Sequence, residues 1–264
     1  MKKIIILILL LTSCTDKMKD QAQKLSKEII IADGHIDLPY RLHKEGLINE
    51  KNINLSVKSS GDFDIPKAKS GGLDSPFMSI YIPSDKSEKE AFNLANLLIE
   101  LVENIIESNE DFEHASSPQD VIDNFKNKKI SLPMGIENGS AIGKEIKNLK
   151  VFFDKGIRYI TLTHAKNNQI CDSSYDKERK WGGLSEFGKK LIYEMNNIGM
   201  MIDVSHVSDD AFFDIMKITS KPVIASHSSP RSLTPGFERN VSVGEHYDGD
   251  KLVQEDIVFL NKKA

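Results

Sequence analysis

The sequence predicts an α/β fold, most simply a (β/α)8 barrel of the TIM type. Short apolar runs rich in β-formers alternate with segments at helical spacing, and polar residues follow directly after those runs. An open Rossmann-like or flavodoxin-like sheet is the alternative, but no GxGxxG follows the first apolar run. The net charge of −4 over 264 residues gives no electrostatic reason to expect a nucleic-acid partner.

The N-terminus has the features of a secretion signal. Lys2 and Lys3 precede the apolar run 4–11, which is too short to span a membrane. The run ends in Leu-Thr-Ser-Cys, which resembles a bacterial lipobox with Cys14 as the lipidated residue. A plain signal peptide with a chance cysteine is the alternative. We expect residues 1–14 to be a lipoprotein signal peptide, 15–28 a polar tether, and the protein to be lipid-anchored in the cell envelope, outside the cytoplasm.

The remaining chain, 29–264, reads as one barrel domain. Its predicted strands are 29–32, 77–82, 130–136, 157–162, 200–204 and 223–225. Helices are predicted at 87–108, 118–125 and 209–218, with one ending near 155 and one beginning after Ser185. The segment 44–72 is polar and loop-like. Six strands are fewer than the eight of a closed barrel, so we expect unpaired sheet edges, which a homodimer would cover.

The segment from Met200 to Arg231 is the best-defined unit. It reads as strand, helix, strand, and Ser205-His206 and Ser226-His227 end the two strands. Parallel neighbours joined by a right-handed crossover end at the same sheet edge. The two imidazoles are therefore predicted to lie in one site.

Polar residues follow the other predicted strands in the same way. The complete set is His35, Asp37, Glu137, His164, His206 and His227. In a parallel barrel these side chains converge on the face where such enzymes place their chemistry. Four imidazoles and two carboxylates exceed the needs of one tetrahedral zinc, which favours two ions bridged by Glu137. That donor set predicts metal-assisted hydrolysis, most simply of an amide, with the mid-loop Cys171 as a bystander.

Several segments of the chain resemble the membrane (renal-type) dipeptidases, zinc peptidases of the M19 type. They are DGHIDLP (33–39), GIENG (135–139), RYITLTH (158–164), GLSEFGKKLIYEMNNIGMMIDVSHVSD (183–209) and PVIASHSSPRSLTPGFERN (222–240). Together they span most of 29–240 in the family's order. The resemblance implies a distorted barrel with two zinc ions. One ion would take His35, Asp37 and Glu137. The other would share Glu137 and add His206 and His227.

The resemblance also implies the reaction, which is hydrolysis of dipeptides by a hydroxide that bridges the two ions. Glu137 and His164 match the catalytic positions, and His164 matches the histidine that contacts the scissile group. Arg239 matches the arginine that holds the terminal carboxylate of the substrate, a task suited to a bidentate guanidinium.

After Asn240 the pattern departs from the family. The family continues with two further strands, the last of which carries a proton-transferring aspartate, whereas Asp248 and Asp250 follow no convincing strand. We therefore expect a truncated dipeptidase that keeps its five metal ligands and has impaired activity. Two alternatives stay open: a catalytically inactive zinc-binding lipoprotein, and an amidohydrolase-type barrel acting on another amide or ester. The second is disfavoured because the first strand ends HxD rather than HxH and no metal-bridging lysine presents itself.

Overall fold

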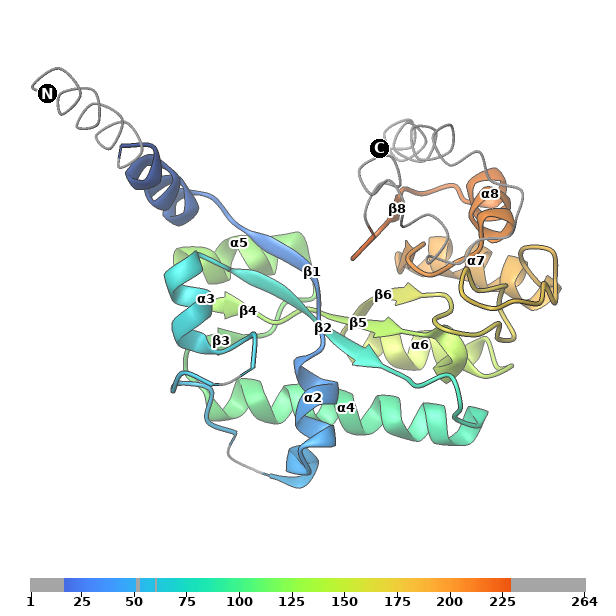
Figure 1. The fold of residues 1–264 in the computed structure, drawn as a ribbon, viewed down its shortest axis with the longest axis horizontal. Coiled ribbons are helices and arrows are strands. Elements are labelled where there is room, and N and C mark those ends of the chain that lie inside the picture. Colours follow the sequence, from blue (N-terminus) through green and yellow to red (C-terminus); the bar gives the residue numbers. More distant parts are fainter. Residues whose placement is uncertain (1–16, 51–52, 60, 229–264) are drawn as a thin grey trace, which may run out of the picture.

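A computed structural model describes residues 17–50, 53–59 and 61–228 of the chain (Figure 1). The candidate residues Cys14 and Arg239, together with Asp248 and Asp250, lie outside these ranges. Within them, no helix combines the length and apolar character that a bilayer crossing would require.

A curled sheet of six parallel strands forms the centre of the molecule, so the predicted α/β class and strand count are confirmed. The sheet forms half a barrel, with the strand order β1-β2-β5-β6-β7-β8. Its strands are β1 (Ala32–Ile36), β2 (Ser75–Tyr81), β5 (Met134–Glu137), β6 (Ile157–Thr161), β7 (Met201–Asp203) and β8 (Val223–Ile224). A separate two-stranded parallel sheet consists of β3 (Phe112–Glu113) and β4 (Ile130–Ser131).

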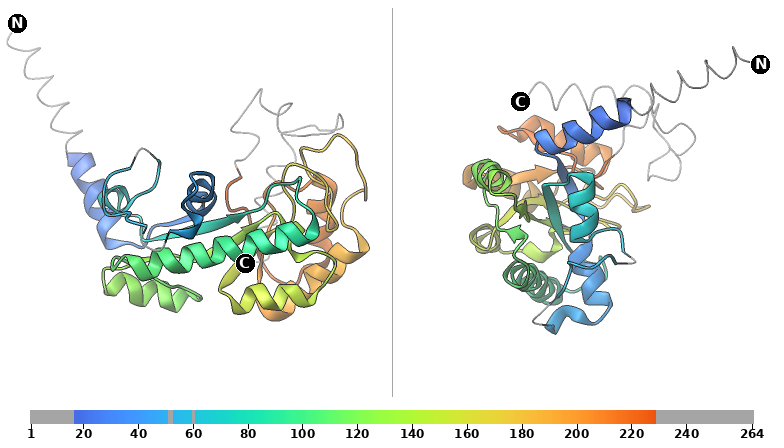
Figure 2. Two further views of the ribbon diagram at one scale, coloured as in Figure 1. Left: turned by 90° about the horizontal axis from the view of Figure 1, so that it is seen from below. Right: turned by 90° about the vertical axis from the view of Figure 1, so that its left-hand side faces the viewer.

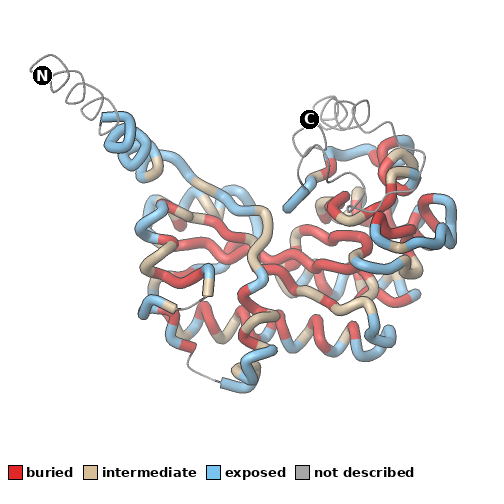
Figure 3. Tube along the Cα trace, viewed as in Figure 1, coloured by how far each residue is buried: buried red, intermediate tan, exposed pale blue. Residues whose placement is uncertain are grey.

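Helices follow most of the strands (Figure 2), and most of these helices bury apolar side chains. They are α2 (Leu38–Lys44), α3 (Ile65–Gly71), α4 (Glu88–Ser108), α5 (Pro118–Lys126), α6 (Lys147–Asp154), α7 (Glu186–Ile198) and α8 (Asp209–Ile218), with short 3-10 turns η1 (Leu47–Asn49) and η2 (Gly139–Ile142). Figure 3 shows the buried residues concentrated in the central strands and along the inner side of α4, while the helical residues 17–28 are mostly exposed.

Helix α4 is specified by its own sequence. Apolar residues recur at helical spacing, and they are buried from Ala91 to Ile106. Ser87 accepts a hydrogen bond from the Glu90 backbone N–H, and the Glu90 side chain accepts one from the Ser87 N–H. This capping box satisfies two of the backbone donors that a helix start leaves without a partner. The predicted start and end of this helix are confirmed.

Two predicted strand positions need correction. The first strand covers 32–36 instead of 29–32, because the Ile31 N–H donates to the Asp74 carboxylate at 2.9 Å and sheet pairing begins only at Ala32. The predicted third strand, 130–136, is two strands that belong to different sheets. Pro133, which lacks a backbone N–H, lies at the break between them.

The segment 44–72 is more ordered than predicted, because it contains η1 and α3. Asp64 begins α3 by accepting from the Lys67 N–H at 2.8 Å, and Pro66 lies in the first turn, where the missing N–H is harmless. Asp64 and Pro66 therefore mark the start of a helix within the segment that was predicted to be loop-like.

The two edge strands approach each other at their carboxyl ends. A Cβ atom at Gly34 would lie 2.4 Å from the Ser226 carbonyl oxygen, so only glycine fits at this position. The next residues in the sequence are His35 and His227, and the centroids of their rings lie 4.0 Å apart. The curl of the sheet thus brings side chains from β1 and the end of β8 into contact.

Candidate metal centre

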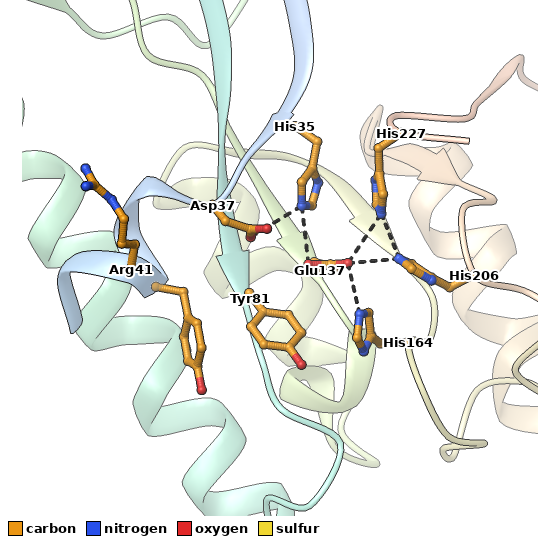
Figure 4. A pocket seen from close by; sticks show the side chains of 9 residues that line it. His35, Asp37, Arg41, Tyr81, Glu137, His164, His206 and His227 are labelled. Atoms are coloured by element: carbon orange, nitrogen blue, oxygen red, sulfur yellow. Dashed lines mark hydrogen bonds and ion pairs between the residues drawn. The ribbon is translucent and has the colours of Figure 1, made fainter. Parts of the chain in front are cut away.

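All six predicted metal-site residues lie at the carboxyl edge of the curled sheet (Figure 4). We call this set the donor cluster: His35, Asp37, Glu137, His164, His206 and His227. His35 lies within β1 and Glu137 is the last residue of β5. The other three histidines each follow the last residue of a strand by three positions, after β6, β7 and β8. The parallel topology therefore assembles the cluster as predicted.

Glu137 lies at the centre of the donor cluster, and its side chain is only 5% exposed. The Nε2 atoms of His206, His227 and His164 lie 3.0, 3.4 and 3.5 Å from Glu137 Oε1. His35 Nε2 lies 3.3 Å from the other oxygen, Oε2. One buried carboxylate therefore faces the same ring nitrogen of four imidazoles.

The close packing of these groups changes the pKa of both kinds of side chain. Burial alone would raise the pKa of Glu137, but hydrogen bonds from His206, His227 and His35 outweigh it and hold the pKa well below its usual range. Burial alone would lower the pKa of His35, but Asp37 and Glu137 raise it to about 9. The attraction between His35 and Glu137 contributes to both shifts, and Asp37 adds to the shift of His35.

The His35 ring nitrogen that does not face Glu137, Nδ1, contacts a tyrosine that the sequence reasoning did not identify. The Tyr159 hydroxyl lies 3.1 Å from His35 Nδ1 and donates to the Gly34 carbonyl oxygen at 3.1 Å. Since that hydroxyl has one proton, it accepts from a protonated Nδ1. In the neutral ring, Nε2 then carries a lone pair that faces Glu137, as a metal ligand requires.

Two residues of the site have backbone conformations that non-glycine residues rarely adopt. His206 has φ +66° and Asn138, directly after Glu137, has φ +77°. The Ser174 N–H donates to the His206 carbonyl at 2.8 Å, and the Asn138 amide donates to the Ile82 carbonyl at 2.9 Å. These contacts hold the strained backbone in place, which is typical of functional sites.

His164 is half-buried at the wall of the pocket. Burial lowers its pKa, so the ring is neutral at pH 7. Its Nδ1 is buried and has no hydrogen-bond partner within the described part of the chain. Its ring also meets the Tyr81 ring edge-on, with centroids 4.9 Å apart. The unpaired Nδ1 is therefore inaccessible behind the pocket wall, and Nε2, 3.5 Å from Glu137 Oε1, is the nitrogen that faces the site.

The donor cluster lines an open pocket of about 410 Å³. Tyr40, Arg41 and Tyr81 complete its lining, and the sequence reasoning missed all three. The signal for them was their position, because Tyr40 and Arg41 begin the helix after the HxD pair and Tyr81 ends β2. Burial and neighbouring carboxylates raise the pKa of Tyr81 to about 12, so it stays a neutral phenol.

The donor atoms fit metal binding. Two groups of three donors each lie within 4.8 Å of one another: His35, Glu137 and His227, and Glu137, His164 and His206. Both groups contain Glu137, and imidazole and carboxylate are ligands that zinc takes. The expected partition was different, because it gave Asp37 to the first ion and placed His227 with His206 at the second. The Asp37 carboxylate is more exposed and lies 3.4 Å from His35 Nε2, so the role of Asp37 stays a prediction.

Cys171 lies apart from the pocket. It is fully buried among apolar side chains, and burial raises the pKa of its thiol above the usual range. This environment fits the predicted bystander role.

Proteins with similar sequences are named dipeptidases. Dipeptidase 3 of Mus musculus is 30% identical over 221 residues, which are 82% of this chain and 44% of that protein. Dipeptidase tcpJ of Claviceps purpurea is 32% identical over 242 residues, covering 88% of this chain and 56% of that protein. The chain thus spans about half the length of these relatives.

Solved structures show the same fold. The probable dipeptidase PvdM of Pseudomonas aeruginosa aligns with a TM-score of 0.78 at 22% identity, covering 94% of this chain and 61% of that one. A metallopeptidase of Rhodobacter sphaeroides, liganded with a phosphinate mimic of the dipeptide L-Ala-D-Ala, aligns with a TM-score of 0.74 at 21% identity, covering 89% and 72%. Residues 19–242 match the sequence model of one family. The chain belongs to the membrane dipeptidases, peptidase family M19.

Proposed function

We propose that this protein is a zinc dipeptidase whose donor cluster binds two zinc ions that share Glu137. The observation that carries the proposal is the convergence of four imidazole Nε2 atoms on one buried carboxylate, at distances of 3.0–3.5 Å. A proton can satisfy one such contact, but four nitrogen donors around one carboxylate suit divalent cations better.

The proposed ligands are those that the sequence predicted: His35, Asp37, Glu137, His206 and His227. When bound, a zinc pair supplies a water of lowered pKa and polarises the substrate carbonyl. Glu137 would neutralise part of the charge of both ions, since it lies between both donor groups. Tyr159 would keep His35 in the tautomer that a metal requires.

His164 is proposed to hold the scissile group of the substrate. Its neutral ring lies in the pocket wall with Nε2 facing the site, and Tyr81 supports it from the side. A hydrogen bond that strengthens as charge develops on the substrate would contribute directly to the rate. Arg239 is proposed to bind the terminal carboxylate of a dipeptide, and Cys14 to carry a lipid that anchors the protein in the cell envelope.

The substrate class rests on the relatives. Two curated relatives are named dipeptidases, and the Rhodobacter structure contains a mimic of L-Ala-D-Ala. We therefore propose short dipeptides, including those with a C-terminal D-residue, as substrates of this chain.

The proposal is tested by zinc content and dipeptide turnover, measured on the same preparation of the full 264-residue chain in detergent. We expect close to two zinc ions per chain and hydrolysis of L-Ala-D-Ala. His206→Ala should lose zinc and activity, whereas His114→Ala, at an exposed histidine outside the pocket, should retain both. Two zinc ions without turnover of any dipeptide would favour a non-catalytic metal-binding lipoprotein. Absence of zinc would contradict the proposal.

A further inference from the structure

A second buried carboxylate, Asp203, lies directly behind the donor cluster. It is the last residue of β7 and is fully buried. Within the described part of the chain it forms no ion pair with lysine or arginine, and its partners are hydroxyl and backbone N–H groups. A buried carboxylate with this environment needs an explanation, because burying a charge without a cation is costly.

The two oxygens of Asp203 have different partners. Oδ1 accepts from the backbone N–H groups of Ser205 at 3.1 Å and Ser226 at 3.0 Å, and from the Ser205 hydroxyl at 2.9 Å. Oδ2 accepts from the hydroxyls of Ser226 at 2.6 Å and Thr161. The backbone contacts fix which oxygen lies on which side.

The Ser226 hydroxyl connects this carboxylate to the donor cluster. Its oxygen lies 2.6 Å from Asp203 Oδ2 and 2.7 Å from His227 Nδ1. An ionised carboxylate only accepts hydrogen bonds, so the single hydroxyl proton of Ser226 points to Asp203. The Ser226 oxygen then accepts from His227, which keeps a ring proton on Nδ1 and makes Nε2, which faces Glu137, the nitrogen available to a metal.

We propose that Asp203 is a positioning residue that sets the tautomer of His227 through the Ser226 hydroxyl. The inference rests on the proposed zinc site, because it explains how one predicted ligand is kept ready to bind. Tyr159, on another strand, acts on His35 in the same way. At both edges of the sheet, a hydroxyl that donates its only proton elsewhere accepts from Nδ1 of the ligand and so orients it.

The substitution Asp203→Asn tests the mechanism because it reverses one hydrogen bond. The two backbone N–H groups require an acceptor at the Oδ1 position, so the asparagine oxygen must lie there and its NH₂ group must face Ser226. The Ser226 hydroxyl then accepts from asparagine and donates to His227 Nδ1. His227 is thereby driven to the Nε2–H tautomer, which cannot bind a metal.

Two measurements on the full-length chain follow. In metal-free protein in alkaline buffer, ¹⁵N-histidine NMR should show His227 as the Nδ1–H tautomer in the parent and as the Nε2–H tautomer in Asp203→Asn. The His227 signals are assigned by their loss in His227→Gln. Chelator competition should show that Asp203→Asn lowers the affinity for one of the two zinc ions by about 10–100-fold.

The double variant separates tautomer control from general damage. Ser226→Ala removes the hydroxyl, so His227 should populate both tautomers. The affinity for zinc should then fall less than in Asp203→Asn. Adding Asp203→Asn to Ser226→Ala should then reduce the zinc affinity no further, because no Ser226 hydroxyl remains whose hydrogen bond could be reversed. A purely structural role of Asp203 would give additive losses instead. Thr161→Val, which removes the other hydroxyl on Oδ2, should leave the His227 tautomer unchanged.

An unchanged Nδ1–H tautomer in Asp203→Asn, or additive losses in the double variant, would overturn the inference. If Asp203→Asn does not fold, Ser226→Ala decides alone, because a His227 that keeps a single Nδ1–H tautomer without the hydroxyl contradicts the mechanism. The tautomer measurement needs no metal. A parent chain that binds no zinc would therefore contradict the proposed function while leaving the NMR result readable.

Discussion

Helix α4 and the donor cluster around Glu137 differ in how their polar groups are satisfied. In α4, the capping box pairs neighbouring residues, and each apolar side chain faces the core at regular spacing. In the donor cluster, residues from separate strands converge on one carboxylate. His206 and Asn138, the residue after Glu137, have positive φ. The helix is thus stable by local rules, whereas the site depends on the assembled fold and on a cation. The predictions below test this difference.

The largest effect is expected for Glu137→Gln. The substitution keeps the shape of the side chain and removes the charge that both donor groups share. We expect the loss of both zinc ions and a fall in dipeptidase kcat of roughly 10³-fold, because the metal contributes several kcal/mol to the transition state. Circular dichroism should show an intact fold. Glu100→Gln, at an exposed carboxylate on α4, is the matched control, and equal losses in both variants would contradict the assignment.

The pH dependence of metal-free protein is expected to follow His35. Its pKa is raised from 6.5 to about 9, so the folded chain holds this proton more tightly than the unfolded chain. The resulting stabilisation is complete below about pH 6.5 and is lost as the pH rises through about 9. The Tm difference between the parent and His35→Gln, measured with chelator, should therefore shrink across that range. Zinc affinity should rise over the same range, because binding requires the proton to leave.

A smaller effect is expected from relieving the backbone strain at His206. Glycine tolerates φ +66°, whereas alanine keeps the Cβ atom that makes this region unfavourable. Since both variants lose the same imidazole, His206→Gly should exceed His206→Ala in the free energy of unfolding by about 1–2 kcal/mol without metal. At exposed Leu97 on α4 the order should reverse, with glycine about 1 kcal/mol below alanine. The same order at both sites would show that the strain is negligible.

The smallest effect is expected for Ser87→Ala. Loss of the capping box should reduce the free energy of unfolding by about 1 kcal/mol in urea titrations. Zinc affinity should not change, because α4 contributes no donor to the cluster. A change in zinc binding would indicate that the helix and the site are coupled more closely than the contacts suggest.

The sequence predicted the fold class and the convergence of the donors because both follow from local patterns. Alternating apolar segments indicated the strands, and His or Glu after each strand indicated the edge where they meet. The start of β1 could not be predicted in this way. It depends on Asp74, some forty residues away, whose carboxylate takes the Ile31 N–H before sheet pairing begins.

The residues behind the donors were also out of reach. Tyr159 and Asp203 lie inside strand segments, where a sequence pattern suggests core packing or the turn that follows. Their role depends on hydroxyl contacts between strands that exist only in the assembled sheet. The direction of such hydrogen bonds is a property of three-dimensional geometry and has no sequence periodicity.

The contact between Gly34 and Ser226 has a consequence for the order of folding. His35 and His227 are 192 residues apart in the chain (227 − 35), and their rings meet only when β1 and β8 have both joined the sheet. Contacts of such long sequence separation form late, because the entropy of closing the loop must be met first. Local helices such as α4 can form early, whereas the donor cluster can be complete only after β8 has docked. In kinetic terms, zinc capture would report a late step of assembly.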